Sequence, residues 1–97
     1  MFRICLTLAA QTDVLGAYDW YETLMPGLGT DFENELAAAI DRIAANPLIA
    51  ATLYRDVRRI LLHRFPYGLF FRVESETIVI IACMHHSRNP KRWEKRA

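Results

Sequence analysis

Two apolar stretches near the C-terminal end of the chain constrain its fold most, because only two residues separate them. Residues 65–74 read Phe-Pro-Tyr-Gly-Leu-Phe-Phe-Arg-Val-Glu, and residues 77–86 read Thr-Ile-Val-Ile-Ile-Ala-Cys-Met-His-His. In the first stretch Leu69, Phe71 and Val73 share one face of an extended strand, and the intervening residues share the other. The second stretch is apolar on both faces and rich in β-branched residues, which predicts the central strand of a sheet.

A strand and a helix are predicted at the beginning of the chain. Residues 2–8 alternate as expected for a strand. Apolar side chains then recur at the spacing of one helical face over residues 14–24. Thr12 is the expected N-cap of this helix, and Asp13 is expected in its first turn, where a negative charge favours the helix dipole. The glycines and the proline of residues 26–29 end the helix.

A second helix is predicted from the sequence Thr30-Asp31-Phe32-Glu33, which has the form of a capping box. Its apolar stripe runs through residues 32–43, and Asn46-Pro47 ends it. Residues 48–55 are expected to form a connector. Residues 57–64 are a further strand-like run, and their charges on both faces suit an edge strand or one side of a groove.

The predicted order of elements is therefore β-α-α-β-β-β. Strands and helices that are grouped in this way, rather than strictly alternating, favour an α+β fold. The short turn between the two helices predicts an antiparallel helical hairpin. We expect this hairpin to cover one face of a small, antiparallel-dominated sheet within a single domain over residues 1–97.

Charge is distributed unevenly along the chain, although the formal net charge is only +1. Residues 1–54 hold two basic and seven acidic side chains, and residues 55–97 hold ten basic and four acidic ones, with all three histidines. This asymmetry suits an anionic partner for one surface. An intramolecular balance of solvated charges explains it equally well.

Two cysteines, Cys5 and Cys83, lie in the predicted strands among apolar residues. We expect both to be buried, reduced thiols in a cytoplasmic protein rather than a disulfide. The apolar start, residues 2–10, is too short for a signal peptide and is interrupted by Arg3. No run is long enough to span a membrane. No cofactor-binding motif is present.

The paired histidines at the end of the second apolar stretch are candidates for acid–base chemistry. On a regular strand His85 and His86 would point to opposite faces, so they could not both bind one metal ion, and no metal site is expected. A strand-end histidine that only bonds to the backbone is the commoner case.

Three further side chains could bind a phosphate or an acidic partner. Arg58 and Arg59 alternate faces, so one of them is expected on the open side of the sheet. Tyr67 follows Pro66 and could stack or donate a proton, or serve only the turn. Solvated charges and a structural tyrosine are the alternatives.

The C-terminal segment is basic and contains an aromatic residue. It suits nucleic-acid stacking with phosphate contact, or an acidic protein segment. The structural alternative, which we favour for the indole, is that Trp93 folds back onto the sheet and anchors the tail. The candidate contacts in this segment are Arg88, Lys91, Arg92, Trp93 and Arg96.

Several short motifs, taken in order, resemble the RelE/ParE superfamily of bacterial toxins. The resemblance covers nearly the whole chain, and it lies in the order and spacing of the pieces as much as in any one of them. They are Trp20-Tyr21-Glu22, Pro26-Gly27-Leu28-Gly29 with Phe32, Asn46-Pro47, Val57-Arg58-Arg59, Phe65-Pro66-Tyr67 and His85-x-x-Arg88-x-Pro90-x-x-Trp93-x-x-Arg96.

The resemblance implies a small cytoplasmic toxin from a type II toxin–antitoxin, plasmid-stabilisation module. A cognate antitoxin would bind and silence it, and operator DNA would be bound mainly through the antitoxin. The target is either DNA gyrase, as in the ParE branch, or messenger RNA on the ribosome, as in the RelE branch.

Residue by residue, the resemblance favours the branch that does not cut RNA. The similar ribonucleases use a glutamate before the second strand, an arginine leading the aromatic strand and a histidine near the C-terminus. Residues 47–54 contain no carboxylate, Gly68 stands where that arginine would be, and only the histidine has a match. We therefore expect growth inhibition through gyrase. The alternative is a ribosome-dependent endoribonuclease, with His85, His86 and Arg59 as its catalytic candidates.

Overall fold

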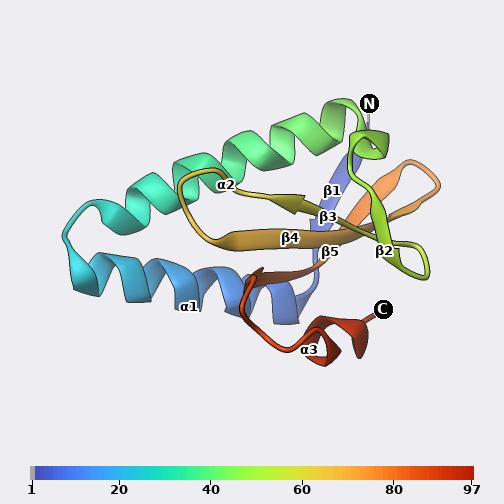
Figure 1. The fold of residues 1–97 in the computed structure, drawn as a ribbon. Helices are drawn as coiled ribbons and strands as arrows, with labels where there is room; N and C mark the ends of the chain where they lie inside the picture. The colour runs from blue at the N-terminus through green and yellow to red at the C-terminus, as the bar shows by residue number, and fades with distance from the viewer. Residues whose placement is uncertain (1) are drawn as a thin grey trace.

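Two helices cover one face of a five-stranded sheet in the computed structural model, which describes residues 2–97 (Figure 1). The predicted α+β fold is confirmed. In chain order the elements are β1 (Arg3–Leu6), α1 (Leu8–Leu24), α2 (Leu28–Ala45), the 3-10 helix η1 (Pro47–Ile49), β2 (Thr52–Tyr54), β3 (Val57–Leu61), β4 (Tyr67–Glu74), β5 (Thr77–His85) and α3 (Lys91–Glu94).

The sheet has the strand order β1-β5-β4-β3-β2. β1 pairs with β5 in parallel, and the other three pairings are antiparallel. β5 is an interior strand, as its apolar sequence predicts, although β4 occupies the middle of the sheet. The prediction that residues 57–64 form an edge strand is wrong for β3, because the short strand β2 lies beyond it. β2 falls within the predicted connector, and its three largely exposed residues carry no alternating pattern.

An irregularity in the pairing of β4 with β5 reverses the faces of the second half of β5. Phe70 pairs with Ala82, but its neighbour Phe71 pairs with Ile80, so Ile81 has no opposite residue. An extra residue of this kind shifts the alternation of side chains by one position. Cys83 consequently joins the core beneath the helices, whereas a regular strand would have turned it away.

Both helices begin earlier than predicted, and both are capped by different residues. The side chain of Thr7, not that of Thr12, accepts a hydrogen bond from the first turn of α1, at 3.1 Å from the amide nitrogen of Ala10. Asp13 is therefore one turn too deep to act at the helix N-terminus.

The N-terminus of α2 is held by a side chain of the preceding helix. The carboxylate of Glu22 accepts from the amides of Gly27 and Gly29, each at 2.9 Å. The predicted capping box over residues 30–33 is wrong, because these residues already lie inside the helix. The short connection between α1 and α2 brings the Glu22 carboxylate to the N-terminus of α2. Within this connection Gly27 adopts a φ of 92°, a backbone conformation that favours glycine.

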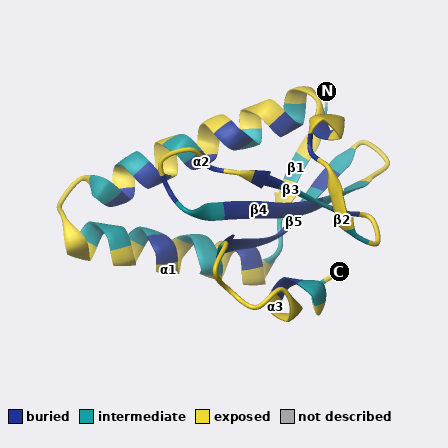
Figure 2. Cartoon of the chain, in the orientation of Figure 1, coloured by how far each residue is buried: buried dark blue, intermediate teal, exposed yellow. Residues whose placement is uncertain are grey.

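The main core lies between the helices and the sheet, and a smaller one lies on the opposite face of the sheet. Figure 2 marks the buried residues of α1, α2, β4 and β5 in dark blue. Phe32, Ile43 and Phe71 are fully buried in the main core. The smaller core contains Phe70 and is covered by Trp93 from α3. Among residues 2–97, no helix has the length and apolar character needed to cross a membrane.

Candidate binding cleft

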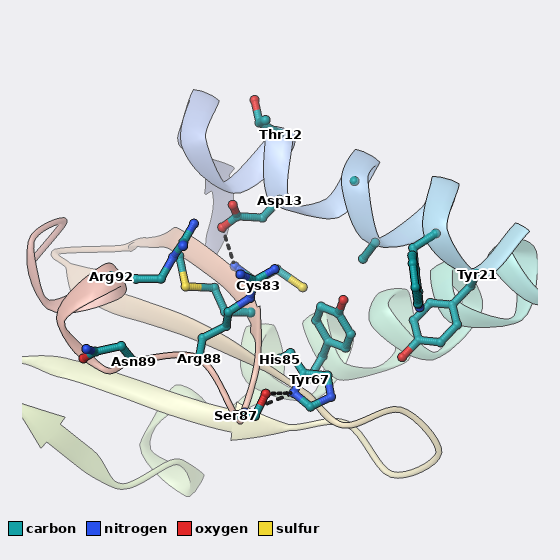
Figure 3. A pocket seen from close by; sticks show the side chains of 14 residues that line it. Thr12, Asp13, Tyr21, Tyr67, Cys83, His85, Ser87, Arg88, Asn89 and Arg92 are labelled. Atoms are coloured by element: carbon teal, nitrogen blue, oxygen red, sulfur yellow. Dashed lines mark hydrogen bonds between the residues drawn. The ribbon is translucent and has the colours of Figure 1, made fainter. Parts of the chain in front are cut away.

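An open cleft of about 930 Å³ lies between α1, the end of β5 and the segment that follows it (Figure 3). α1 contributes Thr12, Asp13, Gly16, Ala17, Trp20 and Tyr21 to its wall. β4 and β5 contribute Tyr67, Cys83, Met84 and His85. The segment after β5 contributes Ser87, Arg88, Asn89 and Arg92. The cleft therefore combines an aromatic and apolar interior with two arginines at its C-terminal side.

Asp13 lines the cleft and joins three parts of the chain. Its Oδ2 accepts a hydrogen bond from the backbone amide of Cys83 at 3.0 Å and lies 2.6 Å from Nη1 of Arg96. The same Nη1 donates to the carbonyl of Ile81 at 3.0 Å. Both side chains are mostly buried, so the pair fastens the C-terminal tail to α1 and β5. The charge of Asp13 is consequently already balanced within the protein.

Burial raises the pKa of three side chains of the cleft. It raises the pKa of the Cys83 thiol to about 12, with the neighbouring Asp13 carboxylate adding to the effect. Burial is also the main cause of the raised pKa of Tyr21 and of Tyr67. For Tyr67 the nearby Arg88 acts in the opposite direction but does not cancel the rise. These groups are therefore hydrogen-bond donors and apolar surface at neutral pH, not bases.

Ser87 holds the ring of His85 in one orientation. Its Nδ1 accepts from the backbone amide of Ser87 at 3.0 Å and lies 2.7 Å from the Ser87 hydroxyl oxygen (Figure 3). Because Nδ1 acts as an acceptor, the ring proton of the neutral imidazole is assigned to Nε2. The ring packs edge-on against Tyr67, with 5.5 Å between centroids.

Comparison with known proteins identifies the family of this chain. Residues 4–90 match the model of a family described as the ParE toxin of the type II toxin–antitoxin system parDE. The chain belongs to this family. The resemblance to RelE/ParE toxins seen in the sequence is thereby confirmed. A search of curated proteins found no match.

A solved structure described as the chromosomal ParDE TA system from P. aeruginosa contains a chain with the same fold. The TM-score is 0.77 at 22% sequence identity, and the alignment covers 88% of this chain and 96% of the other. At this identity the likeness concerns the fold alone. The ParE family assignment rests on the family model.

Four of the residues predicted to carry function come together in the cleft of this ParE-family chain. They are Tyr67, His85, Arg88 and Arg92. His86 instead lines a smaller depression of about 300 Å³ beside the turn before β4. The two imidazole rings do not diverge as on a regular strand, since their centroids are 5.0 Å apart and β5 ends at His85. Within residues 2–97 there is no cluster of side chains suited to holding a metal ion.

The remaining predicted residues lie elsewhere and make contacts of their own. Nη1 of Arg58 donates to the carbonyl of Ala50 at 2.6 Å and ties η1 to the sheet. Arg59 pairs with Phe70, which places it on the face opposite the helical hairpin, so one of the two arginines faces that side as expected. The catalytic trio His85, His86 and Arg59 is not assembled in one cleft.

Three predicted residues of the tail lie outside the cleft and have different surroundings. Trp93 is buried against Phe70, with ring centroids 4.6 Å apart and planes inclined by 22°, so its predicted role as an anchor is confirmed. Arg96 is committed to Asp13. Lys91 is exposed at the start of α3. Of the basic tail residues, Arg88 and Arg92 are thus the two that face the cleft.

The sequence did not identify Asp13, Gly16 or Trp20 as residues of this site. In the sequence, Trp20 belongs only to the family-like motif Trp20-Tyr21-Glu22, and 61% of its surface is exposed beside the cleft. The helical pattern of the sequence places Asp13 at a helix terminus. Its spacing from Cys83 and Arg96 along the chain is too large for any local pattern to connect them.

The two cysteines should differ strongly in reactivity. Cys5 is exposed on the edge strand β1, contrary to expectation, whereas Cys83 is buried. At pH 8 the thiolate fraction of Cys83 should lie on the order of a thousand-fold below that of a thiol with the ordinary pKa of 9.0. We expect iodoacetamide to modify Cys5 alone in the folded protein, and both cysteines in urea. Mass spectrometry of Cys5→Ser provides the control, and rapid modification of that variant without urea would contradict the assignment.

Proposed function

We propose that this chain is a toxin that arrests growth through DNA gyrase and that a cognate antitoxin neutralises it by binding. Membership of the ParE family over residues 4–90 is the observation that carries the proposal. The chemistry of the cleft supports a binding role. The pKa values of Cys83, Tyr21 and Tyr67 are raised, which disfavours a role as a base, and Asp13 is paired with Arg96.

The arginines at the mouth of the cleft supply the charge that an acidic partner would recognise. Arg88 and Arg92 are exposed, and neither is engaged in an ion pair among residues 2–97. An arginine that keeps its guanidinium free can bind a carboxylate in a bidentate manner. We assign these two arginines to partner recognition.

One observation favours a second candidate function, a ribosome-dependent endoribonuclease. Tyr67, His85 and Arg88 line the same cleft, and these are residue types that can transfer protons and stabilise a phosphorane. The hydrogen bonds from Ser87 occupy Nδ1 of His85, so only Nε2 would serve such chemistry.

Induction of the chain without its antitoxin separates the two functions. Pulse labelling of DNA and protein synthesis in the same culture should show that DNA synthesis falls first, with messenger RNA intact. The variant His85→Ala should remain toxic. An early fall in protein synthesis with transcripts cut at ribosomes, abolished in His85→Ala, would replace the gyrase proposal with the ribonuclease.

Charge reversal at the mouth of the cleft tests partner recognition. We expect Arg88→Glu combined with Arg92→Glu to weaken antitoxin binding by about a hundredfold, which is equivalent to about 1.4 kcal/mol per arginine. The matched control is Lys95→Glu, which changes an exposed charge of the tail outside the cleft. Equal affinity of all three proteins in titration calorimetry would remove both arginines from the interface.

A further inference from the structure

β5 has an open edge inside the cleft, because its parallel neighbour is shorter. The pairing of β1 with β5 ends where Leu6 lies opposite Ile80, and the last bond runs from the amide of Thr7 to the carbonyl of Ile80. β5 continues to His85. Within the described residues 2–97, its last part therefore pairs with β4 on one side and with no strand on the other.

The first part of this edge is bonded to side chains in place of a strand. Arg96 donates to the carbonyl of Ile81, and Asp13 accepts from the amide of Cys83. The amide and the carbonyl of one strand residue point to the same side, and alternate residues repeat this direction. The carbonyl of Cys83 and the amide of His85 therefore also face the cleft. An extended segment in the cleft could hydrogen-bond to both.

The opposite wall of the cleft contains a glycine that the chain itself does not need there. Gly16 lies in the interior of α1, where glycine is a poorer helix former than alanine. Outside the backbone of its own helix and the two adjacent residues, a methyl group built on its α-carbon would meet no atom within 4 Å, so packing against the rest of the chain does not require a glycine. It is one of the residues of α1 that line the cleft. A close approach by the backbone of another molecule would explain the residue.

The charge of the cleft indicates the chemistry of that molecule. Arg88 and Arg92 stand at its mouth, and the charge of Asp13 is already balanced by Arg96. The exposed indole of Trp20 and the rings of Tyr21 and Tyr67 offer apolar surface beside them. An occupant with acidic and apolar side chains complements this lining.

We propose that a short, extended and acidic segment of the antitoxin adds to the open edge of β5 at Cys83 and His85 and crosses α1 over Gly16. This inference rests on the proposed function, because it names the place where the antitoxin of this toxin binds. Main-chain hydrogen bonds would supply affinity, and the arginines would select acidic side chains.

Two substitutions of Gly16 test the close approach without depending on a loss of folding. Gly16→Ala should raise the Tm of the free chain by about 5 °C, because it improves the helix and meets no neighbour. It should nevertheless weaken binding of the purified antitoxin roughly tenfold, and Gly16→Leu should weaken it a hundredfold or more. The control is Leu15→Ala, which removes a 63% exposed side chain from the part of α1 outside the cleft.

Hydrogen exchange of the complex tests the added strand itself. The amide of His85 should become protected when the antitoxin binds, whereas the amide of Ser87, which already bonds to Nδ1 of His85, should change little.

Wild-type affinity in Gly16→Leu, or an unprotected His85 amide in a saturated complex, would overturn the proposal and leave the proposed function standing. Loss of gyrase binding instead of antitoxin binding in Gly16→Leu would assign the cleft to the target. No antitoxin binding by the wild-type chain would contradict the proposed function.

Discussion

Trp93→Ala is expected to lower the free energy of unfolding by about 3–5 kcal/mol, the range for truncating a large buried aromatic side chain. Only 7% of Trp93 is exposed. Its ring stacks on Phe70 and meets Tyr54 edge-on, with 6.2 Å between the centroids of the second pair. Without the indole, Val57 and Met84 would lose their cover on this face of the sheet.

The chain provides its own matched control for this change. Trp20→Ala removes the same side chain from a surface position that is 61% exposed, and its effect should stay within about 1 kcal/mol. Urea unfolding followed by circular dichroism measures both variants on one scale. A Trp93→Ala variant as stable as Trp20→Ala would show that the tail does not depend on its indole for docking.

The order of the elements was predictable because the two longest strands are local patterns. Leu69, Phe71 and Val73 do share the face that packs beneath the helices, as their alternation predicts. The position of the tail was also predictable from Trp93. A large apolar side chain among charged residues is buried most readily when the tail folds back onto the sheet. These inferences needed only the side-chain period of a strand and the cost of exposing apolar area.

The helix boundaries were not predictable, because more than one residue suited each cap. Thr7 and Thr12 are equally good N-cap residues by type, and pairing of β1 decides in favour of Thr7 by ending the strand at Leu6. The sequence of α2 offers a capping box that is not used. Glu22 reaches its N-terminus first from the preceding helix, which is a contact that no local motif encodes.

The cleft was only half predictable. The histidine and the arginines that follow β5 were visible as a cluster in the sequence. The opposite wall was not, because it depends on the packing of α1 beside β5. The faces of Cys83 and His85 depend further on the unpaired Ile81. A regular strand would have turned Met84 and His86 toward α1 instead.

Asp13→Ala is expected to cost about 2–3 kcal/mol of unfolding free energy, since it removes a charged acceptor from two donors that cannot easily find another. The amide of Cys83 would lose its partner in a partly buried position. Arg96 would keep only its bond to the carbonyl of Ile81. The control is Asp19→Ala, which removes an exposed carboxylate from the same helix. A cost no larger than that of the control would contradict the anchoring role.

Arg96→Ala and the double variant Asp13→Ala/Arg96→Ala separate the contribution of the ion pair to the unfolding free energy from that of the other hydrogen bonds of these two side chains. If Asp13 and Arg96 acted only through their ion pair, the two single changes would cost the same, and the double variant would cost no more than either. Because Asp13 also accepts from the amide of Cys83, and Arg96 also donates to the carbonyl of Ile81, we expect the double variant to cost more than either single change. The same interaction holds the tail against α1 and β5, so a loosened tail should also weaken antitoxin binding through Arg88 and Arg92. Antitoxin affinity that is unchanged in Asp13→Ala would separate the anchor from the binding surface.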